Sequence, residues 1–297
     1  MLCSGMAFSR LARVCICVVT IGGAAACLNG SKAVLTQQAE AHRLASHLRV
    51  QFTRAADASN RAVMADTDEA SSAAAREAQQ ATQSVQQDID GLHRILEDLG
   101  DRDEVAQLDR FKARFEEYRA LDATILPLAV ENTNIKAQRL SFGPAQDAVN
   151  TFRQSIDAAA RTAAPNNSRV ETLVAQQTAA LLDVQVMQAR HIAESDDAAM
   201  TGIEARMTAA ESTARKALES VKGLLPAAAG SQLAAASAAL DRFTAINAEI
   251  VTLSRRNSNV RSLALSLGKK RTVSAECDDI LQELEDTLAK HHFSATR

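Results

Sequence analysis

Two short stretches hold the residues best suited to bind a ligand. Each stretch places an asparagine, an apolar residue and a basic residue in succession. Asn134-Ile135-Lys136 and Asn259-Val260-Arg261 are 125 positions apart, and Arg139 adds a cation near the first. Amides beside cations could hold an anionic ligand through charge-assisted hydrogen bonds. A turn with a solvated flank explains the same pattern more simply. The candidate ligand-binding residues are Asn134, Lys136, Arg139, Asn259 and Arg261.

Patterns that could hold a metal or haem have simpler explanations. Met187 and His191 share a helical face and could ligate haem, but a packed methionine and a histidine near a helix end account for them. Asp90-Gly91-Leu92-His93 only approximates the Glu-x-x-His of a di-iron bundle, and it occurs once. We therefore expect no metal and no cofactor. Two acidic clusters could hold calcium but also suit helix starts: Asp66, Asp68 and Glu69, and Glu194, Asp196 and Asp197.

Composition excludes several functional classes. The chain contains no nucleophile–base arrangement, glycine-rich phosphate loop or zinc-ligand spacing, so we expect no enzyme. A net charge of −3 and no interleaving of basic and aromatic residues argue against nucleic-acid binding. The chain has no Trp and one Tyr, and it is rich in helix-forming residues. The fold class is therefore predicted to be all-α.

The two candidate stretches belong to an internal repeat. Residues 118–143 and 243–268 align without a gap, with nine identities in 26 positions. A second pair of similar blocks, 65–70 and 193–198, occurs in the same order. Repeats of this kind indicate a duplicated structural unit. We therefore predict two halves, 31–164 and 168–293, separated near Pro165.

Apolar residues in each half follow helical spacing. In the second half Phe243, Ile250, Asn257 and Leu267 lie on one heptad face, which resumes at Cys277. A stripe this narrow needs partner helices. We predict antiparallel up-down four-helix bundles in two tandem halves. If the helices run straight through Asn132 and Asn257, the alternative is one long four-helix bundle made of two helical hairpins.

Several residues suggest where the helices end. Gly100 is a helix stop, and Ser168-x-x-Glu171 is a capping box. The hydroxyls of Thr67 and Ser195 suit helix N-caps. Asn132 and Asn257 could each adopt the left-handed conformation, with Thr133 or Ser258 capping the next helix.

The N-terminal segment, residues 1–30, has the features of a targeting signal. Arg10 and Arg13 precede an apolar run over 14–28, which is short for a membrane span. Small residues precede Cys27, so lipidation at Cys27, simple cleavage and an uncleaved anchor all stay open. Each places the remainder outside the cytoplasm, in the periplasm or cell envelope.

The repeat resembles a known sensor fold. Residues 190–200, followed by 203–207, resemble the turn between the first two helices in the four-helix-bundle ligand-binding domain of methyl-accepting chemotaxis receptors. Residues 125–152 are similar to that family's third-to-fourth helix turn, with Asn132 at the usual glycine position. Such receptors continue into a second membrane helix and a cytoplasmic coiled coil, and this sequence shows neither. The resemblance implies two sensing modules without the signalling part.

Together these observations predict a non-enzymatic, extracytoplasmic, sensor-like protein that binds a small ligand or an envelope partner. A separate transmembrane receptor or kinase would supply the output. Related receptors form dimers, so the duplication could produce a dimer or imitate one within a single chain. The alternative is a structural envelope protein that acts as a spacer and binds no small molecule.

Overall fold

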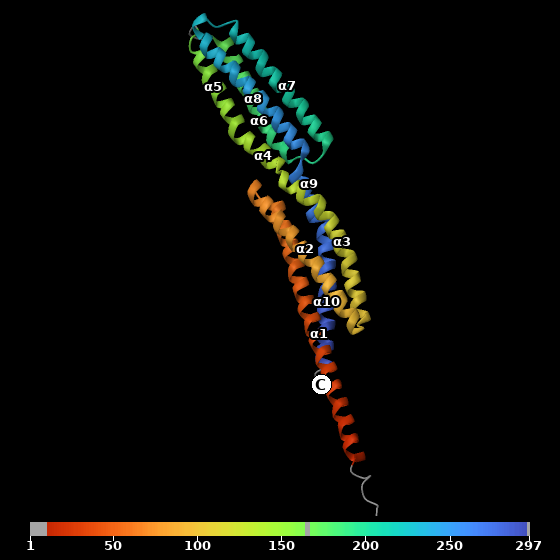
Figure 1. Cartoon of the computed structure of the whole chain (residues 1–297). Coiled ribbons are helices and arrows are strands. Elements are labelled where there is room, and N and C mark those ends of the chain that lie inside the picture. Colours follow the sequence, from red (N-terminus) through yellow and green to blue (C-terminus); the bar gives the residue numbers. More distant parts are fainter. Residues whose placement is uncertain (1–10, 164–166, 296–297) are drawn as a thin grey trace, which may run out of the picture. The chain divides into compact units, whose positions relative to one another are not determined.

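The computed structural model describes the backbone of residues 11–163 and 167–295, and side chains over 32–163 and 167–290. The all-α prediction is confirmed, because the described residues form helices and no strand (Figure 1). The first half contains α1 Leu11–Met64, α2 Asp68–Leu99, α3 Arg102–Glu131, α4 Thr133–Leu140, the π-helical η1 Ser141–Ala145 and α5 Gln146–Ala160. The second half contains α6 Ser168–Ala193, α7 Asp197–Lys222, the 3₁₀ turn η2 Ala227–Ala229, α8 Gly230–Arg256, α9 Ser258–Leu265, the π-helical η3 Ser266–Lys270 and α10 Arg271–Ala295.

Most predicted helix ends are close to the observed ones. Gly100 has a φ of 77°, a left-handed conformation in which glycine has no steric penalty, and it ends α2. Thr67 caps α2, because its Oγ1 accepts the Ala70 N–H at 3.1 Å. Two caps differ from prediction by one residue. Asp196 rather than Ser195 caps α7, and Asn167 rather than Ser168 caps α6.

The chain divides into two compact units, and each draws on both halves of the sequence. Among the described residues, the first unit contains 11–58, 76–120 and 270–295. The second unit contains 59–75 and 121–269. These units do not coincide with the predicted halves, 31–164 and 168–293. The reason is that the sequence repeat follows the order of the chain, whereas burial of apolar faces joins α10 to helices of the first half.

The core of the first unit is aromatic. Phe52 of α1 meets Phe111, Phe115 and Tyr118 of α3 at centroid distances of 5.3 to 6.2 Å, in edge-to-face geometry. Such pairs contribute about 0.5–1.5 kcal/mol beyond their buried area. Lys270 lies 5.1 Å from the Tyr118 centroid and is buried, so its charge faces the ring.

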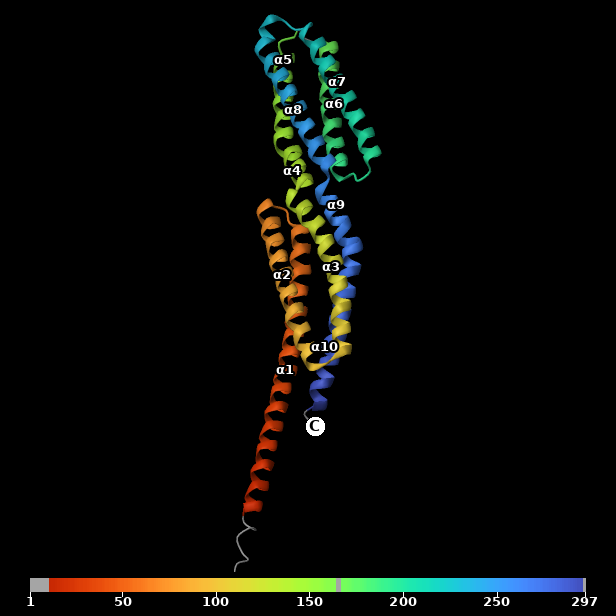
Figure 2. The same ribbon diagram turned by 45° about the vertical axis from the view of Figure 1, so that its right-hand side comes forward.

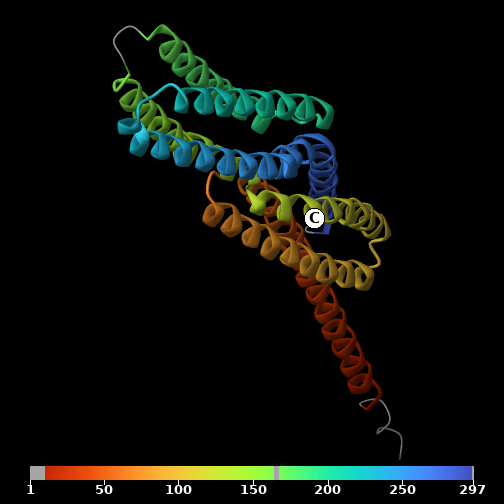
Figure 3. The same cartoon turned by 90° about the horizontal axis from the view of Figure 1, so that it is seen from above.

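The second unit contains four mutually packed helices, α5, α6, α7 and α8. Helix α6 packs against α7 and α5 packs against α8, while α6 also contacts α5 and α8. These helices lie side by side in Figure 2, and Figure 3 shows α7 alongside α8. Their core consists mainly of alanine, leucine and isoleucine, with Phe152 and Phe243 as its buried aromatic residues.

Asn132 and Asn257 interrupt their helices without reversing the chain. Both are left-handed, with φ of 50° and 55°, as predicted. Helical hydrogen bonding resumes at once, because Lys136 N–H donates to the Asn132 carbonyl and Arg261 N–H donates to that of Asn257. Within the second unit the chain passes from the end of α3 through α4 into α5 in one direction (Figure 2). These sites are therefore neither reversing turns nor parts of an unbroken helix.

The predicted heptad face is lost after Asn257. Phe243 and Ile250 are buried as predicted, but Leu267 is 63% exposed. The left-handed Asn257 and the kink in η3, where Gly268 has a non-helical φ of −88° and ψ of −113°, both change the angle between successive residues, so the apolar face rotates away. Cys277 is buried again within α10. Phe142, which lies in the equivalent turn η1, is 73% exposed.

Candidate functional site

The two copies of the repeat meet at a site that we call the crossing, residues 131–134 and 256–259. Here each copy caps the helix of the other. The Thr133 N–H donates to Ser258 Oγ at 3.1 Å, and the Ser258 N–H donates to Thr133 Oγ1 at 3.0 Å. Capping hydroxyls were predicted at these residues, but each was expected to cap its own helix. The exchange satisfies N–H groups at the starts of both α4 and α9.

The neighbouring asparagines repeat this exchange. Asn134 N–H donates to Asn259 Oδ1 at 3.1 Å, and Asn259 N–H donates to Asn134 Oδ1 at 3.2 Å. The Asn134 side-chain amide also donates to Asn257 Oδ1, as that of Asn259 does to Asn132 Oδ1. Each residue thus bonds its counterpart in the other copy, which is the pattern of a two-fold symmetric interface.

Further hydrogen bonds tie the crossing to α2 and α6. The Asn132 amide donates to Asp68 Oδ1 at 3.0 Å and to Ser71 Oγ at 2.9 Å. The first of these bonds is the main reason that the pKa of Asp68 is lowered. Asn134 donates to the Ile192 carbonyl at 2.7 Å. At the end of α6, Asn257 likewise donates to the carbonyl of Glu194 at 2.8 Å.

One pair of equivalent positions has opposite charges. Glu131 and Arg256, which are 125 residues apart, form a bidentate ion pair with two bonds of 2.6 Å. The hydrogen bond from Arg256 lowers the pKa of Glu131. Two identical copies would place like charges at this point, so the copies differ in a way that makes them complementary.

The structure assigns the candidate ligand-binding residues to different environments. The amides of Asn134 and Asn259 are engaged within the crossing. Lys136 donates to the Glu131 carbonyl at 2.9 Å and lies 3.3 Å from Asp68. Arg139 donates to the Asp66 carbonyl at 2.6 Å. The Arg261 side chain is exposed and has no ion-pair partner among the described residues.

A buried hydrogen-bonded chain inside α5–α8 was not predicted. Ser141 Oγ donates to Gln188 Oε1 at 2.8 Å, and Gln188 Nε2 donates to Asn247 Oδ1 at 2.9 Å. Asn247 in turn donates to Glu211 Oε1 at 2.8 Å. Desolvation raises the pKa of Glu211. A sequence signal existed, since Asn247 lies on the same heptad face as Phe243 and Ile250.

His191 takes part in a second buried cluster. Its Nδ1 lies 2.6 Å from Ser254 Oγ, and its Nε2 lies 2.8 Å from Glu204 Oε1. Glu204 also accepts from Arg255, and this bond is the main reason that its pKa is lowered. Both ring nitrogens of His191 are therefore engaged by protein groups and neither is free to ligate haem. Met187, the other residue of the considered haem pair, is buried in the same helix.

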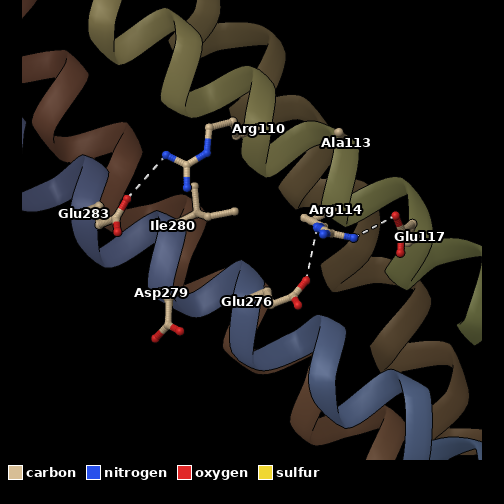
Figure 4. Close-up of a pocket in the computed structure, with 8 residues that line it drawn as sticks. All are labelled: Arg110, Ala113, Arg114, Glu117, Glu276, Asp279, Ile280 and Glu283. Carbon is tan, nitrogen blue, oxygen red and sulfur yellow. Dashed lines mark hydrogen bonds and ion pairs between the residues drawn. The ribbon is translucent and has the colours of Figure 1, made fainter.

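The first unit contains a surface groove between α3 and α10 (Figure 4). Both of its arginines are paired with carboxylates. Arg114 pairs with Glu117 at 3.0 Å and with Glu276 at 3.1 Å, while Arg110 lies 3.6 Å from Glu283. The groove therefore has no unpaired cation for an anionic ligand, and its four carboxylates leave it with a net negative charge.

Two further observations concern metals and membranes. Within the described part of the chain, no group of three or more His, Cys, Asp or Glu residues could hold a metal ion. Over the same residues, no helix combines the length and apolarity needed to cross a bilayer. The predicted targeting segment, residues 1–30, and its candidate lipidation site Cys27 lie outside the residues whose side chains are described.

Comparison with protein-family models, with curated proteins and with solved structures finds no match to this chain.

Proposed function

We propose that this chain is a non-enzymatic, sensor-like helical protein in which the crossing passes a change in one helix to both copies of the repeat. The contacts of α6 carry this proposal. The carbonyls of Ile192 and Glu194, at the end of that helix, accept hydrogen bonds from Asn134 and Asn257. A shift of α6 would disturb one asparagine of each copy, so the binding of a ligand to α5–α8 could favour one packing of the crossing.

The wider setting belongs to the same proposal. The chain acts outside the cytoplasm and is held at the cell envelope by its N-terminal segment, through lipidation at Cys27 or as an anchor. Its helical units are of the chemotaxis-receptor type and use a separate transmembrane receptor or kinase for output. The pairing of residues 125 positions apart supports the idea that one chain imitates a receptor dimer.

A thermal-shift screen with amino acids, organic acids, aromatic acids and uncharged amides tests whether the chain binds a small molecule. We expect one ligand class to raise the melting temperature, because a ligand that binds only the folded state stabilises it. Asn257→Ala should retain ligand binding. We expect the ligand to perturb the NMR signals of Asn134 in the unaltered chain and less so in this variant.

A spacer without a ligand is the second candidate, and one observation favours it. The side-chain amides of Asn132, Asn134 and Asn259 all have protein partners at the crossing, as a rigid joint requires. No stabilisation by any ligand class, together with capture of an envelope protein in a pull-down, would support the spacer and contradict the sensor.

A further inference from the structure

Helix α6 contains two buried glutamines with opposite surroundings. Gln188 is fully buried, and both of its amide atoms have partners, Ser141 and Asn247. Gln177 is also fully buried, yet neither its Oε1 nor its Nε2 has a hydrogen-bond partner. An unsatisfied buried polar group loses its bonds to water without replacement, at a cost of about 1–3 kcal/mol. Gln177 is therefore a polar group that needs an explanation.

The hydrogen bonds of Gln188 and His191 show what lies level with Gln177. Gln177 is eleven residues, or about three helical turns, before Gln188. Eleven residues after Ser141, the partner of Gln188 before α5, the chain reaches Phe152 in α5. Eleven residues before Asn247, its partner in α8, lies Ala236. Gln177 also lies fourteen residues before His191, which contacts Glu204 in α7. Fourteen residues after Glu204 lies Leu218. All three residues are apolar and buried.

This level of the bundle therefore places one primary amide among buried apolar residues. A primary amide has an acceptor oxygen beside a donor nitrogen, so it can form paired hydrogen bonds with another amide, in which donor and acceptor are also adjacent. A charged ligand would lose its hydration without compensation, because no lysine, arginine, aspartate or glutamate is fully buried in the described residues of α5–α8. The best match is a small uncharged molecule with adjacent donor and acceptor groups.

We propose that the α5–α8 bundle binds a small uncharged carboxamide or lactam through the side-chain amide of Gln177. The site rests on the proposed sensor function, for which it supplies the input. Gln177 shares α6 with Ile192, and the α6 carbonyl of Ile192 is hydrogen bonded to Asn134 at the crossing. Displacement of α6 by a ligand at Gln177 would thus alter the hydrogen bond between Ile192 and Asn134, fifteen residues away along the helix.

Two matched substitutions test the premise. Gln177→Leu removes an unpartnered amide, so we expect an unchanged or higher melting temperature. Gln188→Leu leaves Ser141 and Asn247 unpaired, so we expect a clearly lower one. If Gln177→Leu destabilises the chain as much as Gln188→Leu does, Gln177 has polar partners and the proposal is wrong.

Titration with acetamide, followed by ¹H–¹⁵N NMR of side-chain amides, tests the binding itself. Acetamide should shift the Gln177 amide signal, while acetone, which has no N–H donor, and acetate, which is charged, should shift it much less. In Gln177→Leu the shifts of neighbouring residues should disappear. Persistence of these shifts in the variant, or no shift in the unaltered chain at any non-denaturing concentration, would overturn the site.

The same spectra separate this site from the proposed function. If acetamide shifts the Gln177 signal together with that of Asn134, both the site and its connection to the crossing are supported. If acetamide shifts Gln177 alone, the site is supported and transmission to the crossing is contradicted. A ligand from the thermal-shift screen that still binds to Gln177→Leu would support the sensor and contradict this location.

Discussion

The two compact units are stabilised in different ways. The first unit packs three aromatic rings of α3 around Phe52 of α1. The second has an alanine-rich core with buried hydrogen-bonded chains through Gln188 and His191. Apart from the Tyr118 hydroxyl and the Lys270 ammonium, the aromatic core is apolar, whereas each buried hydrogen bond depends on both of its groups. The first core therefore mainly provides stability. The second favours one packing of its helices, because a shift of any helix would break buried hydrogen bonds.

The largest effect is expected in the aromatic core. Phe52→Ala should lower the free energy of unfolding by about 3–5 kcal/mol, because it removes a fully buried ring and leaves a cavity among three others. Chemical denaturation measures this loss. Phe142→Ala is the control, since Phe142 is 73% exposed and its loss should change stability by about 0.5 kcal/mol or less. Equal losses in the two variants would contradict the aromatic account of the first unit.

At the crossing we expect a smaller loss. Asn134→Ala should cost about 2–3 kcal/mol, because it leaves the Asn259 N–H, the Ile192 carbonyl and Asn257 Oδ1 without their partner. Denaturant melts measure the cost, and hydrogen exchange at the start of α9 should increase. Asn150→Ala, at an exposed position on α5, should cost nothing measurable. A silent Asn134→Ala would show that the exchanged bonds do not stabilise the crossing.

Two glutamates of α7 should respond to pH with opposite signs. Desolvation raises the pKa of Glu211 above its ordinary 4.5, so its stabilising protonated form prevails at low pH and is lost as pH rises through the folded pKa. Glu211→Gln should therefore raise the melting temperature near neutral pH and change it little below pH 4.5.

Glu204 is the matched opposite case. The bond from Arg255 lowers its pKa, so its contribution is present above 4.5 and is lost as pH falls through the folded pKa. Glu204→Gln should lower the melting temperature at neutral pH, and the difference should shrink in acid. Melting curves from pH 3 to 8, with buffers of constant ionic strength, compare the two variants. A change of melting temperature in the same direction for both variants at neutral pH would contradict the environments assigned to the two glutamates.

The smallest effect is expected from the charges of the crossing. Glu131→Arg places two arginines at equivalent positions and should slightly lower the melting temperature, because the pair is partly exposed to solvent. Adding Arg256→Glu restores opposite charges in reversed order and should recover most of the loss. High salt should reduce both differences. A double variant less stable than either single variant would contradict direct pairing of the two side chains.

The sequence was sufficient to predict some features of this structure. Composition and periodicity predicted helices, and Asn132 and Asn257 were correctly expected in the left-handed conformation, since asparagine tolerates it. The burial of Leu267 was predicted wrongly, because a heptad count assumes a constant angle per residue and η3 changes that angle. Periodicity also cannot show which helix lies opposite. For that reason the contact of Gln188 with Asn247 was missed, and the caps of Thr133 and Ser258 were assigned to their own helices.

The exchange between Thr133 and Ser258 has a consequence for how the two halves can evolve. A newly duplicated gene encodes identical halves, so positions 131 and 256 began alike, and their present opposite charges arose by later divergence. At three of the four equivalent positions of the crossing, 131/256, 133/258 and 134/259, each residue bonds its counterpart, so a change in one copy affects the other. Correlated substitutions at a separation of 125 positions are therefore the evolutionary signature that this joint should leave among descendants of the same duplication.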